Sequence, residues 1–127
     1  MSETGNQNDI REHFAAQGVR LWRNNVGVLA DRNGRPVRFG LGNDSAETNR
    51  LIKSSDLIGW RPTLVTPDMV GTCVAVFTSI EVKADGWRYR PGDARAAAQK
   101  RWLDMVRADG AIGGFMIDPT RGFIDGL

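Results

Sequence analysis

The sequence has very few of the side chains that build covalent cross-links or multi-histidine metal sites. It contains one cysteine and one histidine in 127 residues. Cys73 alone cannot form a disulfide within the chain, and its place in an apolar run predicts a buried small side chain. His13 alone excludes metal sites made of several histidines. No Gly-x-Ser-x-Gly motif is present, so the usual signal of a serine hydrolase is also missing.

Long apolar segments are missing as well. No run of 18 apolar residues is present that could cross a membrane, and the polar start, residues 1–5, does not resemble a signal peptide. We therefore expect no membrane partner and a cytoplasmic location. The length of 127 residues, with 41% hydrophobic and 25% charged residues, predicts one compact domain that spans the chain.

Lysine is scarce, whereas arginine is abundant. Only 3 of the 17 basic residues are lysine and the other 14 are arginine. The net charge of +2 is too small to indicate a polyanionic partner by itself. Arginine offers a planar fork that binds phosphate oxygens in pairs, but a GC-rich coding sequence would produce the same bias. The arginine content is therefore only weak support for a nucleic-acid partner.

The first half of the chain reads as a helix followed by short strands. Residues 1–8 are polar and are expected to be frayed, and Asn8 or Asp9 could cap a helix that Gly18 stops. Two strand segments and a hairpin return are expected after it, at residues 19–23, 26–30 and 37–41. A loop or a short irregular helix should follow over residues 42–53.

The second half has stronger patterns. A short strand is expected at residues 55–60, and the apolar run 72–83 predicts a long, central, buried strand. Asp93 should cap a helix that ends at Gly110, and residues 111–117 should form a last strand. A strand directly after a helix is typical of a crossover onto the same sheet. The order α-β-β-β-α-β therefore predicts an α/β sandwich with one mixed sheet of four or five strands.

Three charged residues stand at strand ends where they could form a site. Asp56 lies on one expected strand, and Glu81 and Lys83 end the next. Side chains alternate along a strand, so Glu81 and Lys83 should point to the same side of the sheet. If the strands are neighbours, Asp56 could join them. Two uncompensated carboxylates would repel each other, so the arrangement favours a bound divalent cation such as Mg²⁺, with the amine of Lys83 free to act on a phosphate or a water.

These residues resemble the PD-(D/E)XK nuclease superfamily and, more closely, the VRR-NUC family. The likeness covers about residues 10–117. It rests on six segments: Trp22-Arg23-Asn24-Asn25-Val26-Gly27, Phe39-Gly40, Ser54-Ser55-Asp56-Leu57-Ile58-Gly59, Ile80-Glu81-Val82-Lys83, Gln99 and Gly110-Ala111. The resemblance implies a restriction-endonuclease-like core in which Asp56 and Glu81 bind the metal, Lys83 is catalytic and Gln99 completes the site. Many members have proline before the aspartate, where this chain has Ser55.

The resemblance also suggests supporting residues. Glu12, or less favourably Asp9, could be a further metal ligand, although a helix glutamate is more often solvated. The backbone carbonyl of Val82 could be another. Arg23 and Asn24 could contact phosphate or fix the active-site loop, or could simply end a strand and form a turn. The loop after the catalytic strand supplies further candidates for nucleic-acid contact, namely Trp87, Arg88 and Arg90.

Together these observations predict a magnesium-dependent endodeoxyribonuclease, in which Mn²⁺ could replace Mg²⁺. Short members of the family resemble Holliday-junction resolvases of bacteria and phages that act as homodimers. We therefore expect branched DNA as substrate, a second copy of the chain as partner, and a bacterial or phage-infected cell as setting. Two alternatives stay open: a nicking or flap nuclease with the same centre, and a nucleic-acid-binding module without catalytic activity.

Overall fold

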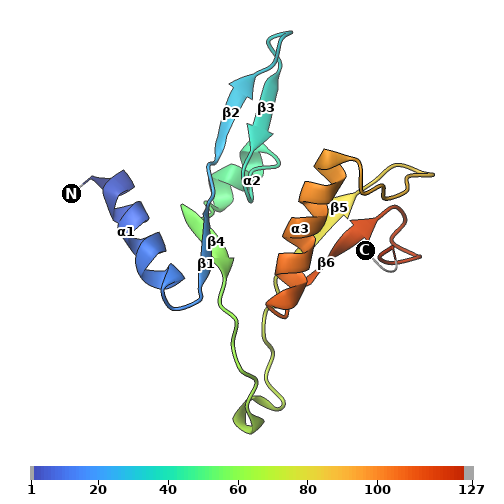
Figure 1. Cartoon of the computed structure of the whole chain (residues 1–127). Coiled ribbons are helices and arrows are strands. Elements are labelled where there is room, and N and C mark those ends of the chain that lie inside the picture. Colours follow the sequence, from blue (N-terminus) through green and yellow to red (C-terminus); the bar gives the residue numbers. More distant parts are fainter. Residues whose placement is uncertain (1, 125–127) are drawn as a thin grey trace. The chain divides into compact units, whose positions relative to one another are not determined.

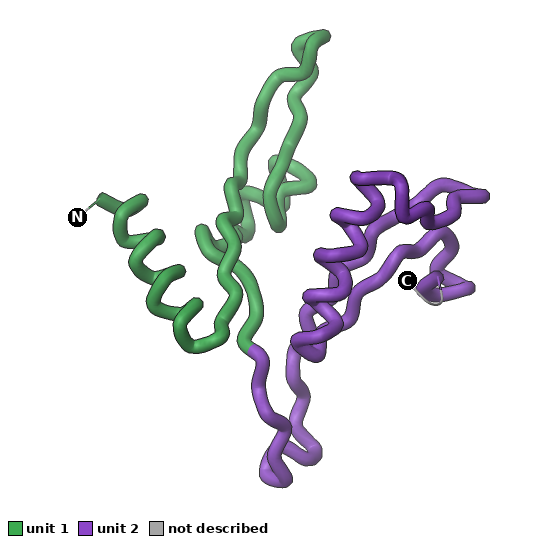
Figure 2. The backbone as a smooth tube through the Cα atoms, in the orientation of Figure 1, with its two compact units in different colours: residues 1–61 green, residues 62–127 purple. Residues whose placement is uncertain are grey.

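The computed structural model describes residues 2–124. The chain forms two compact units, Met1–Arg61 and Pro62–Leu127, each with its own helices and strands (Figure 2). Helices and strands occur in both, so the protein is of mixed α/β type (Figure 1). None of the helices formed by residues 2–124 combines the length and the apolar character that a membrane crossing requires. The prediction of a single domain stays a prediction.

The first unit begins with helix α1, Glu3–Ala15. The side chain of Ser2 caps it by accepting a hydrogen bond of 3.0 Å from the backbone N–H of Gly5, and Glu3 places a negative charge in the first turn. The expectation that residues 1–8 are frayed is therefore wrong from residue 3 onward. The helix ends at Ala15, slightly earlier than expected, and the chain turns at Gly18, the predicted stop, which has a φ of 78°.

Strand β1, Arg20–Arg23, pairs antiparallel with β4, Leu57–Trp60. The two backbones approach closely at Gly59, where an added Cβ would lie only 1.7 Å from the carbonyl oxygen of Arg20. A residue with a side chain could not keep this pairing. Arg23 lies at one end of this ladder, and Asp56 directly precedes β4 at the same end.

A hairpin and a short helix complete the first unit. Strands β2, Gly27–Ala30, and β3, Pro36–Phe39, pair antiparallel across a turn in which Asp31 Oδ1 accepts from two backbone N–H groups. Asn43 is 2% exposed and ties the base of the hairpin, since its Nδ2 donates to the carbonyls of Gly27 and Phe39. Helix α2, Ala46–Leu51, follows, where the sequence predicted either a loop or a short irregular helix.

The second unit is built around a strand-helix-strand crossover. After the short 3₁₀ helix η1, Pro67–Met69, the chain forms β5, Thr78–Val82, then α3, Ala94–Ala108, then β6, Ile112–Met116. Strands β5 and β6 are parallel, as the crossover predicted. Asp93 caps α3 by accepting hydrogen bonds from the backbone of Arg95 and Ala96, and Gly110 reverses the chain after it, both as predicted.

The core of this unit lies between α3 and the two strands. Leu103, Val106 and Phe115 are at most 1% exposed. Gly113 lets the helix approach β6, because an added Cβ there would lie 3.1 Å from Val106 Cγ1. The close contact of α3 with β5 and β6 fixes the helix side chains that face β5.

Two predictions about the sheet are wrong. Among the described residues the strands form three two-stranded sheets, β1 with β4, β2 with β3 and β5 with β6, in place of one mixed sheet of four or five strands. The run 72–83 is strand only over Thr78–Val82. Because β6 begins just after the turn at Gly110, it offers its first hydrogen bond to Phe77, and earlier residues of the run gain no partner from it. Cys73, expected to be buried, is consequently exposed.

Candidate active site

The second unit brings three of the predicted site residues together. Glu81 lies on β5 and Lys83 directly follows it, so their side chains leave the same face of the extended chain while Val82 turns away and is 72% exposed. Gln99 lies on α3, in the turn that faces this part of β5. The alternation that the sequence predicted for Glu81 and Lys83 is therefore what the strand adopts.

The amide of Gln99 joins the two charged groups. Lys83 Nζ donates a hydrogen bond of 2.7 Å to Gln99 Oε1, and Gln99 Nε2 donates one of 3.0 Å to Glu81 Oε1. Lys83 Nζ lies 3.9 Å from Glu81 Oε1, at the outer limit of an ion pair. The three side chains form a closed triangle in which the amide satisfies the amine on one side and the carboxylate on the other.

A second contact sets the register of the helix against the strand. Trp102 Nε1 donates a hydrogen bond of 2.9 Å to Ser79 Oγ. Ser79 precedes Glu81 by two residues and Trp102 follows Gln99 by three, which are the spacings of one strand face and one helix face. The two hydrogen-bonded pairs therefore stand side by side. Ser79 was not among the predicted site residues, although its period-two spacing from Glu81 could have indicated it.

Lys83 lies in a mostly aromatic environment. Its ammonium is 4.9 Å from the ring centroid of Trp87 and 5.7 Å from that of Phe115, and its side chain is only 15% exposed. The two rings are themselves in contact, with centroids 4.8 Å apart. Attraction between a cation and an aromatic face supports the lysine in addition to its hydrogen bond with Gln99. Trp87, predicted to touch nucleic acid, contacts the catalytic candidate itself.

Asp56 belongs to the first unit, where it is exposed just before β4. Its backbone carbonyl accepts a hydrogen bond of 2.8 Å from the N–H of Asn24. The side chain of Asn24 holds the neighbouring segments: Oδ1 accepts from Leu41 N at 3.2 Å, and Nδ2 donates to Ser54 Oγ at 2.8 Å and Ser55 O at 2.9 Å. Since both amide protons are used, the geometry favours fixing of the loop over phosphate contact for Asn24.

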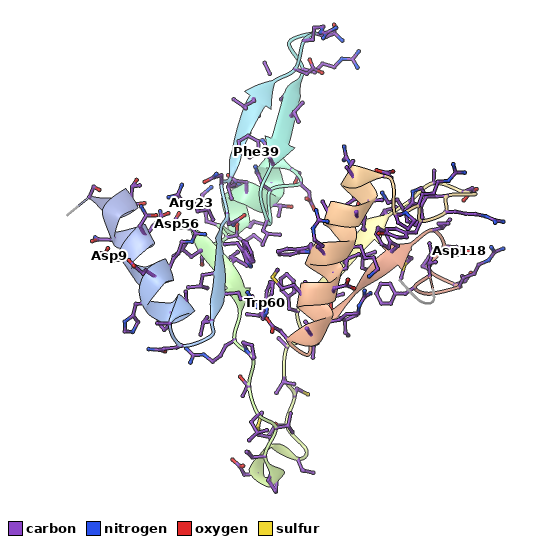
Figure 3. The ribbon with its side chains drawn as sticks, viewed as in Figure 1. Asp9, Arg23, Phe39, Asp56, Trp60 and Asp118 are labelled. Atoms are coloured by element: carbon purple, nitrogen blue, oxygen red, sulfur yellow. The ribbon has the colours of Figure 1, made fainter. Side chains whose placement is uncertain are left out.

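Arg23 and Glu12 occupy other places on the first unit. Arg23 lies near Asp56 at the end of the β1–β4 ladder (Figure 3), and its guanidinium donates to Asn8 Oδ1 at 2.8 Å. Glu12 lies on α1 and lines an open cavity of about 490 Å³ next to β1. Arg11 and Arg20 line the same cavity, and their positive charge disfavours a cation beside Glu12.

Carboxylates are few around the triangle. Within residues 2–124, no three side chains of the histidine, cysteine, aspartate and glutamate types are grouped closely enough to hold a metal ion. Glu81 contributes one carboxylate oxygen to Gln99. Its other oxygen, Oε2, accepts no hydrogen bond from the residues that the structure describes. With an exposed fraction of 38%, the Glu81 side chain is open to a ligand from solvent.

Comparison of the chain with protein-family models, with curated proteins and with solved structures finds no match.

Proposed function

We propose that the protein is a metal-dependent endonuclease that hydrolyses phosphodiester bonds in DNA, with Glu81, Lys83 and Gln99 at its centre. The observation that carries the proposal is the Gln99 bridge. A glutamine that accepts from an amine and donates to a carboxylate keeps both in fixed places and leaves each with unused capacity. The resemblance of these residues to the VRR-NUC pattern supports the same chemistry.

The residues at the centre fit a hard divalent cation such as Mg²⁺. This ion prefers oxygen ligands, keeps several waters, and is usually held by one or two protein carboxylates together with substrate phosphates. Glu81 Oε2 supplies one oxygen, and the backbone carbonyl of Val82 is a second candidate. Asp56 stays a predicted ligand, and Glu12 has no necessary part. Bound Mg²⁺, or Mn²⁺ in its place, would neutralise phosphate charge and lower the pKa of a coordinated water.

The role of Lys83 follows from its donors. An ammonium group has three N–H donors, and Gln99 accepts one of them. The other donors can meet a phosphate oxygen or hold an attacking water, and the positive charge is complementary to the charge that develops on phosphate in the transition state. The aromatic rings limit access of bulk water to the amine, which strengthens its interaction with phosphate.

The substrate we propose is branched DNA cut by a homodimer, in the manner of a Holliday-junction resolvase. Two symmetric cuts in a four-way junction require two active sites related by a two-fold axis, which a pair of identical chains supplies. A nicking or flap nuclease would use the same centre, so the substrate panel decides between them. Light scattering coupled to gel filtration measures whether the chain is a dimer in solution.

The test is a cleavage assay with the full chain. A labelled four-way junction and a matching linear duplex are incubated with the protein, with and without Mg²⁺, beside Lys83→Met, Glu81→Gln and Asp56→Asn. We expect metal-dependent cutting of the junction and a loss of about 10²-fold or more in rate for Lys83→Met.

Lys100→Met is the matched control. Lys100 lies on the same unit and is paired with Asp104 at 2.7 Å, so its replacement removes the same charge without touching the centre. It should cut as the parent chain does. Absence of cutting by the parent chain on every DNA substrate, with binding retained, would identify a non-catalytic binding module. Full activity of Lys83→Met would show that another group performs the chemistry.

A further inference from the structure

The segment that follows Lys83 has two chemically different sides. Trp87 and Tyr89 both lie on Phe115, with ring centroids 4.8 Å and 6.2 Å from it. Phe115 is completely buried, so these two contacts anchor the segment to the core of the second unit. Arg88 and Arg90 alternate with the two aromatic residues and are exposed. The anchoring of one side therefore presents the two arginines on the other.

These arginines have no acidic partner in the part of the chain that the structure describes. Neither takes part in an ion pair or a side-chain hydrogen bond there. The nearest acid along the chain on the helix side, Asp93, is occupied because its carboxylate caps α3. Three other arginines are paired with acids, among them Arg50 with Glu47 at 2.7 Å. The charge on Arg88 and Arg90 is thus available to a partner.

We infer that Arg88 and Arg90 form a contact surface for the phosphate backbone of a DNA strand, and that Trp87 anchors this surface instead of stacking on a base. Residues two apart in a chain lie at most about 7 Å apart, and the long guanidinium side chains can reach neighbouring phosphates of one strand. The inference rests on the proposed function for its substrate and extends it to the way in which the strand is held.

The recognition should be independent of sequence. Base readout requires side chains fixed in position so that their donors match a base edge, whereas phosphate contact requires mainly charge. Because no side chain of the described residues holds Arg88 or Arg90, these groups are suited to phosphate and poorly suited to base discrimination. A strand bound there would run beside Lys83, which lies against the ring of Trp87.

The experiment measures binding without cleavage. Fluorescence anisotropy of a labelled four-way junction and of two duplexes of unrelated sequence is recorded in EDTA over a range of salt concentrations, for the full chain and for Arg88→Ala/Arg90→Ala. Each phosphate contact contributes about 0.9 to the slope of log affinity against log salt. We expect the slope of the double variant to be smaller by about 1.8. Its affinity at about 0.1 M salt should fall roughly tenfold for each arginine removed, and by the same factor on every DNA sequence.

Two comparisons make the result decisive. Arg50→Ala/Arg121→Ala removes the same charge from arginines that are already paired with acids, and it should leave the slope unchanged. Trp87→Phe keeps an aromatic anchor and should bind as the parent does. An unchanged slope in Arg88→Ala/Arg90→Ala, or a loss confined to one DNA sequence, would each overturn the inference.

Together with the cleavage assay described above, this binding experiment separates the inference from the proposed function. If the parent chain cuts DNA but the arginine variant binds with an unchanged slope, the nuclease proposal stands and the contact surface is wrong. If no DNA is cut but binding depends on the two arginines, the surface is correct and the catalytic proposal is wrong.

Discussion

Replacement of Gln99 by methionine tests the central triangle most directly. Methionine has nearly the same length and volume but neither accepts from Lys83 nor donates to Glu81, so the change removes two hydrogen bonds and leaves the packing of α3 nearly unchanged. The charged partners, which lie 3.9 Å apart, would then share no hydrogen-bonding group. We expect both the stability and the cleavage rate to fall.

The size of the expected loss in stability follows from how deeply the side chains of Lys83 and Glu81 are buried. A hydrogen bond to a charged group contributes about 1.5–3 kcal/mol when it is shielded from water. Lys83, at 15% exposure, should retain most of such a value, whereas the bond to Glu81, at 38% exposure, is screened by solvent and should contribute less than about 1 kcal/mol. Closer approach of the amine to the carboxylate would recover part of the loss. The free energy of unfolding should therefore fall by about 2 kcal/mol.

Two measurements check this prediction. Urea unfolding followed by tryptophan fluorescence should show a midpoint lower by about 1 M, if the free energy of unfolding falls by about 2 kcal/mol per M of urea. The kcat on a DNA substrate should fall about 10²-fold, because misplacement of a reacting group by about 1 Å has an effect of this size, while the affinity for DNA stays constant. A double-mutant cycle with Lys83→Met should give a coupling energy of at least about 0.5 kcal/mol.

Gln17→Met is the matched control, since Gln17 makes a single exposed contact with His13 and its loss should change stability by less than about 0.5 kcal/mol. A Gln99→Met protein that is destabilised but keeps the parent kcat would show that the amide only supports the fold. A protein changed in neither property would refute the bridge altogether.

Three further predictions concern other parts of the chain. Asn24→Asp keeps the acceptor but loses both donors, one of them to Ser54, and should destabilise the chain to urea by about 1–3 kcal/mol, whereas Asn25→Asp should have little effect. Trp87→Leu removes the ring over the Lys83 ammonium and should lower kcat, whereas a loss confined to DNA affinity would indicate base stacking instead. Hydrogen bonds from two basic side chains on α3 lower the pKa of Asp104 from its ordinary 3.8. Its ionised form therefore stabilises the fold above about pH 4. Asp104→Asn should lower the free energy of urea unfolding by about 0.5 kcal/mol at pH 7, a small value because the carboxylate is half exposed. This difference should vanish as the pH falls through the lowered pKa.

Helices could be predicted where the residues that start, form and end them lie close together in the sequence. The third helix has an aspartate cap, an alanine-rich body and a glycine stop, and all of these act within a few residues. The start of the first helix was missed because Ser2 looks like part of a polar tail. A cap of this kind is recognised only when the turn after it is known to be helical.

Strand pairing is not local, and the predictions failed there. The run 72–83 has strong strand propensity throughout, but only the part opposite β6 finds a hydrogen-bonding partner. What decides the length of the strand is the position of Gly110, which lies outside the run. The burial of Cys73 was predicted from the same pattern and failed for the same reason.

Some features of the candidate site could be predicted from the sequence and others could not. Period-two spacing along the strand was enough to place Glu81 and Lys83 on one face, whereas Gln99 entered only through the family resemblance. The contacts of Lys83 with two aromatic rings could not be predicted, since they depend on a loop and on a strand that follows 32 residues later, at Phe115.

The neutral amide at position 99 has an electrostatic consequence. An ammonium and a carboxylate in direct contact, at about 2.8 Å, would largely cancel each other's field. Here the uncharged amide of Gln99 forms hydrogen bonds with both groups, and the two opposite charges lie 3.9 Å apart. At this separation the two charges attract each other more weakly than charges in direct contact would, so the amine can bind an anion and the carboxylate a cation at a smaller cost.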